Sequence, residues 1–292
     1  MPQRVRLIFR RTLVTLTVLV AACVGGFLVL VLGGGPAWHL RVYQQQIDAG
    51  TRAIAAAPTD SGRAAGYVQR GRGYAEIARY RHVMRSVSAA EYVRLYQSAM
   101  HDLDAAVRLD PDNVETLNAR GLTYFEHNWT AVENKFESGD AVEILLVQAK
   151  ADFAAVIDRD ARNWTALDYR GMTNEKLGDY EAAIDDYTRV SQVDPRLGQL
   201  RLADLYCRRG GMWAKDKQYD KAVADLELSI SLEANADACE CDPYSPLLWT
   251  YFEGLGDLDK SWALVQRAQG SRRWLMPELL EKLRAASPQI AR

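Results

Sequence analysis

The side chains best suited to chemistry in this sequence are its four cysteines, and their spacing limits what they can do. Cys239 and Cys241 flank a single glutamate, and Cys207 lies far before them in the chain. A tetrahedral metal site takes four ligands, and the fourth cysteine, Cys23, stands in an apolar N-terminal stretch. We therefore predict no metal site, and we leave open a disulfide among Cys207, Cys239 and Cys241 in an oxidising compartment.

The other candidates for catalysis are scattered along the chain. The four histidines, His39, His82, His101 and His127, are not spaced as metal ligands on one helix face. The sequence contains no phosphate-binding glycine loop, dinucleotide fingerprint or nucleophile elbow. The acidic pair Asp185-Asp186 is interpreted as part of a solvated helix face. The sequence thus predicts no catalytic residue, no cofactor and no small-molecule substrate, and we expect a protein that is not an enzyme.

Charge is unevenly divided along the chain. Residues 1–47 hold no Asp or Glu, and Arg4, Arg6, Arg10 and Arg11 precede a long apolar run. The rest of the chain is mildly acidic, within a net charge of −2. A mildly acidic body lacks the basic face that nucleic-acid binding requires, so we expect no nucleic-acid partner.

The apolar run, Thr12–Leu32, carries no charge along its whole length. A helix of that length spans about 30 Å, the thickness of the hydrocarbon core of a bilayer. The basic flank places residues 1–11 in the cytoplasm and the large domain across the membrane. We therefore predict a single-pass protein with a periplasmic domain at a bacterial inner membrane, and a mitochondrial membrane is the alternative.

Two other interpretations of this stretch remain open. Val20-Ala21-Ala22-Cys23 resembles a bacterial lipoprotein cleavage box, in which Cys23 would be acylated. A cleaved signal peptide is the other, although its apolar region is usually about 7–15 residues long. The apolar run continues past Cys23 to Leu32, which favours an uncleaved anchor.

The rest of the chain contains a repeat. Each copy has a large residue, two residues, Arg-Gly, two more residues and, in most copies, an aromatic residue. The Arg-Gly pairs occupy 70–71, 120–121, 170–171 and 209–210. Each pair is followed by an alanine with a large apolar residue four positions later: Ala99 and Leu103, Ala149 and Phe153, Ala183 and Tyr187, Ala222 and Leu226.

This pattern resembles the signature of tetratricopeptide (TPR) repeats, in which the two blocks belong to the two helices of a hairpin. The resemblance covers roughly residues 60–235. It implies an all-α solenoid of about four stacked hairpins with degenerate caps, preceded by the transmembrane helix. Small residues let the two helices of a hairpin approach closely. We therefore expect Gly71, Gly121, Gly171 and Gly210 at the helix–helix contacts.

The first two repeats are longer than the other two. Gly171 and Gly210 are followed at the same short distance by the motif alanines Ala183 and Ala222, whereas Ala99 and Ala149 come much later after their glycines. Ser88 and Asp140 begin sequences that resemble capping boxes. We expect the additional residues to lengthen the second helix of each of these hairpins. The expected helices, which would form a ridge at the membrane-proximal end, lie near Ala89–Arg108 and Ala141–Asp158.

These patterns divide the chain into consecutive parts. Residues 33–62 form a linker and an N-terminal capping helix near Gln46–Pro58. The repeats, 63–234, occupy 63–112, 113–162, 163–196 and 197–234. The last part, 235–292, contains a loop at Asn235–Pro246, a degenerate hairpin at Pro246–Ala268 and a final polar helix at Pro277–Ala286. Solenoids need such caps to cover their terminal apolar faces.

In TPR arrays the first helices line a concave groove that binds other proteins. The resemblance therefore implies a membrane-anchored scaffold that assembles or stabilises a membrane or cell-envelope complex, with membrane-associated proteins as partners. The alternative is a lipoprotein adaptor, acylated at Cys23, in cell-wall or secretion machinery. The expected groove residues are Glu115, Asn118, Leu122, Phe125, Thr165, Asp168, Met172, Glu175 and Asp204.

Overall fold

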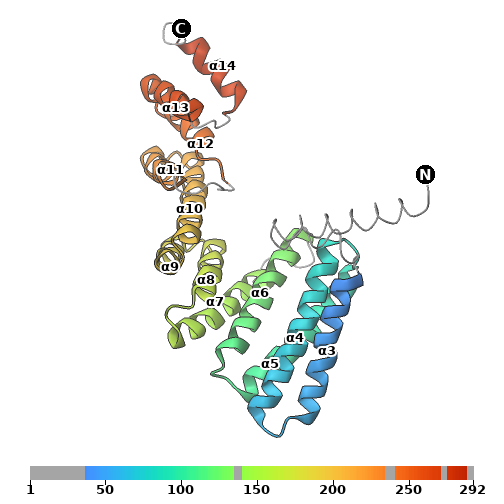
Figure 1. Ribbon diagram of the computed structural model, residues 1–292. Coiled ribbons are helices and arrows are strands. Elements are labelled where there is room, and N and C mark those ends of the chain that lie inside the picture. Colours follow the sequence, from blue (N-terminus) through green and yellow to red (C-terminus); the bar gives the residue numbers. More distant parts are fainter. Residues whose placement is uncertain (1–36, 135–139, 234–240, 271–274, 288–292) are drawn as a thin grey trace, which may run out of the picture. The chain divides into compact units, whose positions relative to one another are not determined.

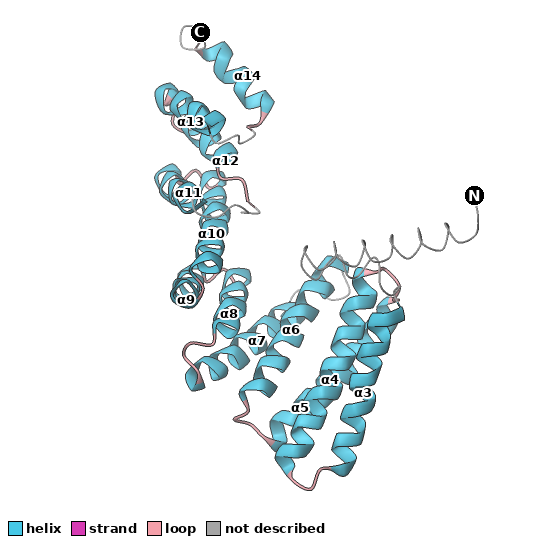
Figure 2. Ribbon diagram, viewed as in Figure 1, coloured by secondary structure: helices cyan, strands magenta, loops and turns pink. Residues whose placement is uncertain are grey.

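The computed structural model describes residues 37–134, 140–233, 241–270 and 275–287. These residues form helices joined by turns and loops, with no strand among them (Figure 2). The expected all-α helical-repeat fold is thus confirmed for this part of the chain. Contacts divide the chain into two compact units, one ending at Thr123 and one beginning at Tyr124, and each is described by itself.

No helix within the described ranges combines the length and the apolar composition that crossing a bilayer requires. The expected span, Thr12–Leu32, lies outside those ranges, as does Cys23. The membrane anchor and its orientation therefore remain predictions.

The first unit contains three long helices side by side, followed by the start of a fourth (Figure 1). These helices are α3 (Ala37–Ala56), α4 (Asp60–Val83), α5 (Ala89–Leu109) and α6 (Val114–Asn134). Its core is built from small and branched side chains: Ala64, Val68, Leu103, Ala106 and Ala119.

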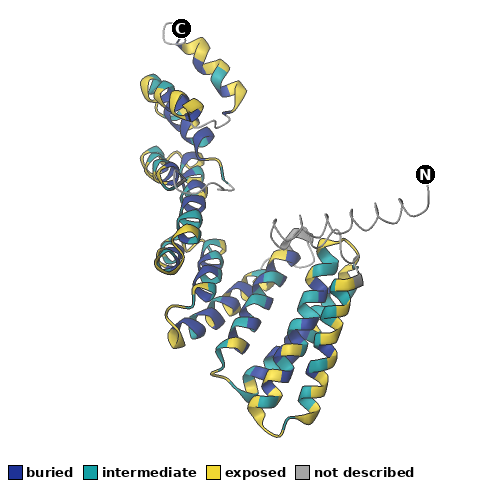
Figure 3. Cartoon of the chain, viewed as in Figure 1, coloured by how far each residue is buried: buried dark blue, intermediate teal, exposed yellow. Residues whose placement is uncertain are grey.

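The second unit begins within α6 and continues as antiparallel hairpins. The helices are α7 (Asp140–Arg159), α8 (Trp164–Lys176), α9 (Tyr180–Val193), α10 (Pro195–Lys215), α11 (Tyr219–Glu233), α12 (Tyr244–Trp249), a π-helical turn η1 (Thr250–Gly254), α13 (Leu258–Gly270) and α14 (Pro277–Ala286). Buried residues recur along each of them (Figure 3). Apolar side chains from α10 to α14 share one continuous core, so the C-terminal helices cover the last repeat.

The motif glycines lie where the two helices of a hairpin meet. A Cβ on Gly171 would lie 2.5 Å from Cε1 of Tyr187, and a Cβ on Gly210 would lie 2.7 Å from Cγ of Leu226. Gly71 faces Leu103 in the same way, and Gly121 is buried. Only a residue without a side chain fits at such contacts, because the facing residues Tyr187 and Leu226 are fully buried.

Three of the motif arginines form ion pairs within their own hairpins, and Arg120 pairs with Asp104 of the preceding hairpin at 3.0 Å. Nε and Nη2 of Arg70 donate to Asp102 at 2.7 and 2.8 Å. Arg209 binds Asp225 with the same two nitrogens at 2.7 and 2.9 Å. Arg170 binds Asp186, whose carboxylate is fully buried. The expectation that Asp186 belongs to a solvated face is therefore wrong; its neighbour Asp185 is exposed.

The additional residues of the first repeat lengthen both helices of the hairpin, not the second alone. Helix α4 continues past Gly71 to Val83, whereas α8 ends at Lys176, soon after Gly171. Helix α5 begins at Ala89, well before its motif alanine Ala99, whereas α9 begins at Tyr180, one turn before Ala183. Each helix thus gains about two turns, or roughly seven residues.

The predicted second helices are confirmed, since α5 and α7 begin and end within one position of the expected bounds. The sequence spacing alone could not divide the additional residues between the two helices of a hairpin. The structure shows that they are shared almost equally, with a slightly longer connection at Met84–Ser88.

Helix α3 begins earlier than the expected Gln46, because it already runs from Ala37. Its first turns pack against the lengthened end of α4, where the rings of Tyr43 and Tyr80 are 6.2 Å apart. A longer α4 thus provides a surface for a longer α3. At the other end of the chain, the expected final helix Pro277–Ala286 is confirmed, whereas the loop expected up to Pro246 ends earlier, at Tyr244, where α12 starts.

Candidate functional site: an apolar groove beside a disulfide

Four of the expected groove residues form a stripe along α8. Thr165, Asp168, Met172 and Glu175 recur every three or four positions, so they share one helix face. Nε and Nη2 of Arg201 donate to Asp168 at 2.7 and 2.9 Å. Although burial opposes it, this interaction keeps the pKa of Arg201 above its ordinary value. Asp168 is 5% exposed, and its carboxylate is bound by Arg201. The prediction that the Asp168 side chain lines an open groove is therefore wrong.

Two other expected groove residues are also buried. Asp204 on α10 is 4% exposed and accepts a hydrogen bond from the backbone N–H of Cys241 at 3.2 Å. Phe125 on α6 is 5% exposed and packs edge-to-face on Tyr169, with ring centroids 5.5 Å apart. The sequence assigned these side chains to the correct helices, but it predicted that they line an open groove, whereas the structure buries them. Packing against neighbouring helices decides which side chains stay accessible.

The remaining expected groove residues differ in environment. Met172 is half-buried against the cluster of Ala183, Tyr187 and Leu205. Asn118 and Leu122 are half-buried in the first unit. Glu115 is bound there by Arg72 at 2.7 Å beside a cavity of about 380 Å³.

A larger cavity lies in the second unit, along α10. Its volume is about 910 Å³, and its wall is mainly apolar. Tyr180, Met212, Pro246, Trp249 and Met276 supply large side chains from α9, α10, α12 and the start of the last segment. We call this cavity the α10 groove. Cavities of this size take a small molecule or a few side chains of a partner protein.

Three of these apolar side chains remain open to solvent. The exposed fractions are 44% for Met212, 38% for Trp249 and 48% for Met276. Exposed apolar groups that gather around a concavity, with polar groups at its rim, mark interaction sites more often than scattered ones do. Aromatic and methionine side chains are also enriched at protein interfaces.

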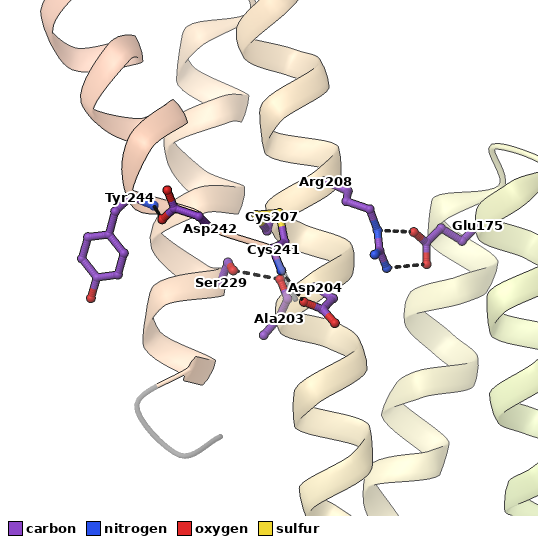
Figure 4. Close-up of a disulfide and its surroundings, with 9 residues drawn as sticks. All are labelled: Glu175, Ala203, Asp204, Cys207, Arg208, Ser229, Cys241, Asp242 and Tyr244. Carbon is purple, nitrogen blue, oxygen red and sulfur yellow. Dashed lines mark hydrogen bonds and ion pairs between the residues drawn. A yellow bond between two sulfur atoms is a disulfide. The ribbon is translucent and has the colours of Figure 1, made fainter. Parts of the chain in front are cut away.

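A disulfide forms part of the wall of the α10 groove. Cys207 on α10 is bonded to Cys241, with Cα atoms 6.2 Å apart and a sequence separation of 34 (Figure 4). Cys207 is almost fully buried. The bond holds the segment before α12 against α10. Among the pairings left open by the sequence, the structure thus shows Cys207–Cys241; Cys239 lies outside the described residues.

Positive charge lies at the rim of the groove. Arg208 of α10 contacts Glu175 of α8, with Nε 2.6 Å from Oε1 (Figure 4). Lys215 and Lys217 line the same cavity and are exposed. Of the predicted groove residues, only Glu175 lines the α10 groove, and it serves there as the partner of Arg208.

Sequence reasoning missed the apolar wall of this groove. Met212 and Lys215 come shortly after the Arg209-Gly210 pair of the fourth repeat, so they lie on a first helix, as the predicted groove residues do. Their place in the repeat pattern could have identified them as groove residues. Trp249 and Met276 could not be found in this way, because the degenerate C-terminal hairpin departs from the repeat pattern.

This chain is similar to several known proteins. A 138-residue segment is 27% identical to DnaJ homolog subfamily C member 7 of Mus musculus; it makes up 47% of this chain and 27% of that protein. The chain therefore spans about a quarter of the length of this relative.

Two solved structures are also similar to this chain. The MamA protein is 21% identical, with a TM-score of 0.42 over 68% of this chain and 89% of that one. BtubC from P. vanneervenii is 16% identical, with a TM-score of 0.47 over 88% and 93% of the two chains.

The match to a family model is local. Residues 170–197 match the model of the tetratricopeptide repeat family. This segment falls on the third predicted hairpin, and the same residue pattern recurs in the neighbouring hairpins. The family match and the recurring pattern thus agree on a helical fold of the tetratricopeptide-repeat type for the repeated part of this chain.

Proposed function

We propose that this chain is a membrane-anchored TPR scaffold whose α10 groove holds a segment of a partner protein. The observation that carries the proposal is the exposed apolar wall of the groove, formed by Met212, Trp249 and Met276. Burying these side chains against a partner removes apolar surface from water, which drives association. The proposal includes no catalytic step, cofactor or small-molecule substrate.

The chemistry of the groove indicates the kind of segment that it takes. Its apolar wall accommodates large aliphatic or aromatic side chains, and the exposed Lys215 and Lys217 at its rim complement acidic residues. We therefore expect a segment with one or two apolar anchors followed or preceded by Asp or Glu. This differs from the mildly acidic character of the whole body, because the local rim is basic.

The disulfide supports an extracytoplasmic position for the repeats. Disulfides persist in oxidising compartments such as the bacterial periplasm. The basic residues before Thr12–Leu32 favour the same side of the membrane for the repeat domain. A span at residues 12–32 would raise the effective concentration of the repeats near membrane-bound partners.

Copurification tests the proposal. The full chain and two variants are isolated in mild detergent, and bound proteins are identified by mass spectrometry. Trp249→Ala removes an aromatic wall of the groove, whereas Trp164→Ala removes a similarly exposed tryptophan outside it. We expect partners that are retained by Trp164→Ala and lost by Trp249→Ala. A chain that is always isolated alone, or partners that both variants keep equally, would contradict the proposal.

The lipoprotein alternative differs in the fate of Cys23. The intact mass of the mature protein separates the two, because a retained Met1 excludes acylation at Cys23. Membrane attachment itself is tested by flotation of the full chain with lipid vesicles at high salt and at alkaline pH, conditions that release peripheral proteins but not a spanning helix.

A further inference from the structure

Three helix ends of the first unit come together on one surface. The first turn of α3, the last turn of α4 and the first turn of α5 meet there. The rings of His39 and Tyr80 are stacked with centroids 5.2 Å apart, and those of His82 and Tyr92 are 5.9 Å apart. We call this surface, formed by residues 38–43 and 76–94, the hairpin end.

Large apolar side chains are exposed on the hairpin end. Val83 is 68% exposed, Trp38 52% and Met84 48%. Val83 and Met84 are consecutive and stand where α4 gives way to the connection to α5. Two adjacent apolar residues are thus exposed at the tip of a hairpin, and an exposed tryptophan stands in the first turn of the neighbouring helix.

The same surface carries an excess of positive charge. The hairpin end contains five arginines and two glutamates. The two glutamates are bound by arginines, Glu76 by Arg79 and Glu91 by Arg81. The other three arginines are exposed and make the surface basic, although the chain beyond its N-terminal segment is mildly acidic: Arg41, Arg85 and Arg94.

The sequence before α3 limits how far the hairpin end can lie from a membrane. Trp38 follows Leu32, the last residue of the proposed span, by six positions. A fully extended chain covers about 3.5 Å per residue, so Trp38 lies within about 21 Å of the end of the span. This step rests on the proposed anchor at residues 12–32.

The lengthened hairpin accounts for the position of Val83 and Met84. About two additional turns in α4 and in α5 carry the connection about 10 Å beyond the end of an ordinary hairpin. Val83 and Met84 stand at the tip of this extension, and the first turn of α3 lies beside them. The second long hairpin has a related feature within its own unit, because Ile144 and Val147 in the first turns of α7 are 54% and 53% exposed.

We propose that the hairpin end seats on an anionic membrane surface. Trp38, Val83 and Met84 enter the boundary between headgroups and acyl chains, where tryptophan and small apolar side chains are favourable. Arg41, Arg85 and Arg94 bind lipid phosphates. Together with the anchor, this contact holds the first unit at the membrane surface in one orientation. A flexible tether alone would not fix that orientation.

Charge distinguishes this occupant from two others. A second copy of the hairpin end would bring the exposed arginines of both copies together, which is unfavourable. The chain's own apolar stretch, residues 12–32, contains no acidic residue that could complement those arginines. Anionic lipid satisfies both the apolar and the basic groups.

Hydrogen exchange of the full chain in lipid nanodiscs tests the proposal. Amide exchange is followed by mass spectrometry in nanodiscs of phosphatidylcholine alone, in nanodiscs that also contain phosphatidylglycerol, and in detergent. We expect residues 80–92 to exchange more slowly with phosphatidylglycerol than in the other two conditions. The connection around Ala57 and Thr59, at the opposite end of α3 and α4, is the internal control and should exchange equally in all three.

Variants separate the contributions of charge and of apolar contact. Arg41→Gln and Arg85→Gln should each weaken the binding of the hairpin end to the anionic membrane about five-fold. This is the effect of one basic residue near an anionic surface. Val83→Asp with Met84→Asp should abolish the protection. Val193→Asp, at an exposed valine of α9 in the other unit, should leave it unchanged.

Each of the other outcomes contradicts the proposed contact between the hairpin end and the membrane. Equal exchange in all three conditions means that the hairpin end stays in water. Protection that persists in detergent means that the chain itself covers the surface, and protection that grows with protein concentration means that a second copy does. A chain that fails to enter nanodiscs at all contradicts the proposed anchor, which flotation detects separately.

Discussion

Arg170 and Asp186 join the two helices of one hairpin through their side chains. Nε of Arg170 lies 3.0 Å from Oδ2, Nη2 lies 2.5 Å from Oδ1, and Nδ2 of Asn174 donates to Oδ2 at 2.9 Å. The hydrogen bonds to Asp186 raise the pKa of Arg170. A similar ion pair joins Arg209 and Asp225, so the third and fourth hairpins each carry a buried ion pair beside the small-residue contact.

Removing one partner of this pair should be strongly destabilising. Asp186→Ala leaves the guanidinium of Arg170 without its carboxylate in a largely buried site, which costs about 3–5 kcal/mol in comparable pairs. Asp185→Ala changes the exposed neighbour and should stay within about 0.5 kcal/mol of the wild type. Urea unfolding followed by circular dichroism measures both. Similar midpoints for the two variants would show that the pair contributes little.

A methyl group at Gly171 should disrupt the third hairpin. It would lie 2.5 Å from the ring of Tyr187, which is 1% exposed and cannot move aside. We expect Gly171→Ala to lower the free energy of unfolding by about 1–3 kcal/mol. At Gly211, in α10, a Cβ meets nothing within 4 Å, so Gly211→Ala should stabilise the helix by up to about 1 kcal/mol. Opposite signs for the two substitutions in thermal unfolding are the expected result.

The disulfide predicts both a thiol count and a loss of stability on reduction. Because two of the four cysteines are bonded to each other, the unreduced, denatured chain should present two reactive thiols. Replacing Cys207 and Cys241 by alanine opens a loop with a sequence separation of 34, for which the chain-entropy description gives about 3–4 kcal/mol. Four reactive thiols in protein isolated without reductant would contradict this pairing.

Asp179 should contribute a pH-dependent part of the stability. It caps α9, and the hydrogen bond from Lys150 at 3.1 Å, with the backbone N–H of Ala182, lowers its pKa. A carboxylate with a lowered pKa stabilises the fold above its unfolded value of 3.8, and that contribution disappears as pH falls through the folded pKa. The stability of the wild type should therefore decline below about pH 4.

Two substitutions at this position separate the charge from the cap. Asp179→Asn keeps an N-cap oxygen and should flatten the decline at acidic pH, by a small amount because the group is exposed. Asp179→Ala loses the cap as well, so it should cost about 1 kcal/mol at every pH. Unfolding midpoints measured from about pH 2 to pH 7 show whether the asparagine variant has the flatter profile.

The repeat pattern was sufficient to predict the hairpins, because it consists of local spacing and residue size. The Ser88 cap is an example: its Oγ accepts the N–H of Glu91 at 3.2 Å, and α5 begins at the next residue. The ion pairs were missed although their signal was present. An aspartate follows the motif alanine by three positions in all four copies, but an acidic residue on a helix reads as solvated until its partner on the facing helix is known.

The candidate site was less predictable than the fold. The expected groove residues of α8 share one helix face, yet the buried Asp168 shows that an arginine of a neighbouring helix, Arg201, can fill such a position. The α10 groove depends on how α12 and the segment before α14 pack on α10, and these have no repeat pattern. Contacts between segments far apart in sequence set the accessible surface, whereas spacing within one segment sets its helices.

The two-turn insertion has a consequence for how such hairpins can change size. Arg70 meets Asp102 as Arg170 meets Asp186, although the sequence separation is 32 in the first pair and 16 in the second. The pairing survives because about seven residues rotate a helix by nearly two complete revolutions, so the faces that meet below the insertion keep their orientation. An increment of about seven residues in each helix therefore lengthens the first hairpin without changing the faces on which Arg70 and Asp102 lie.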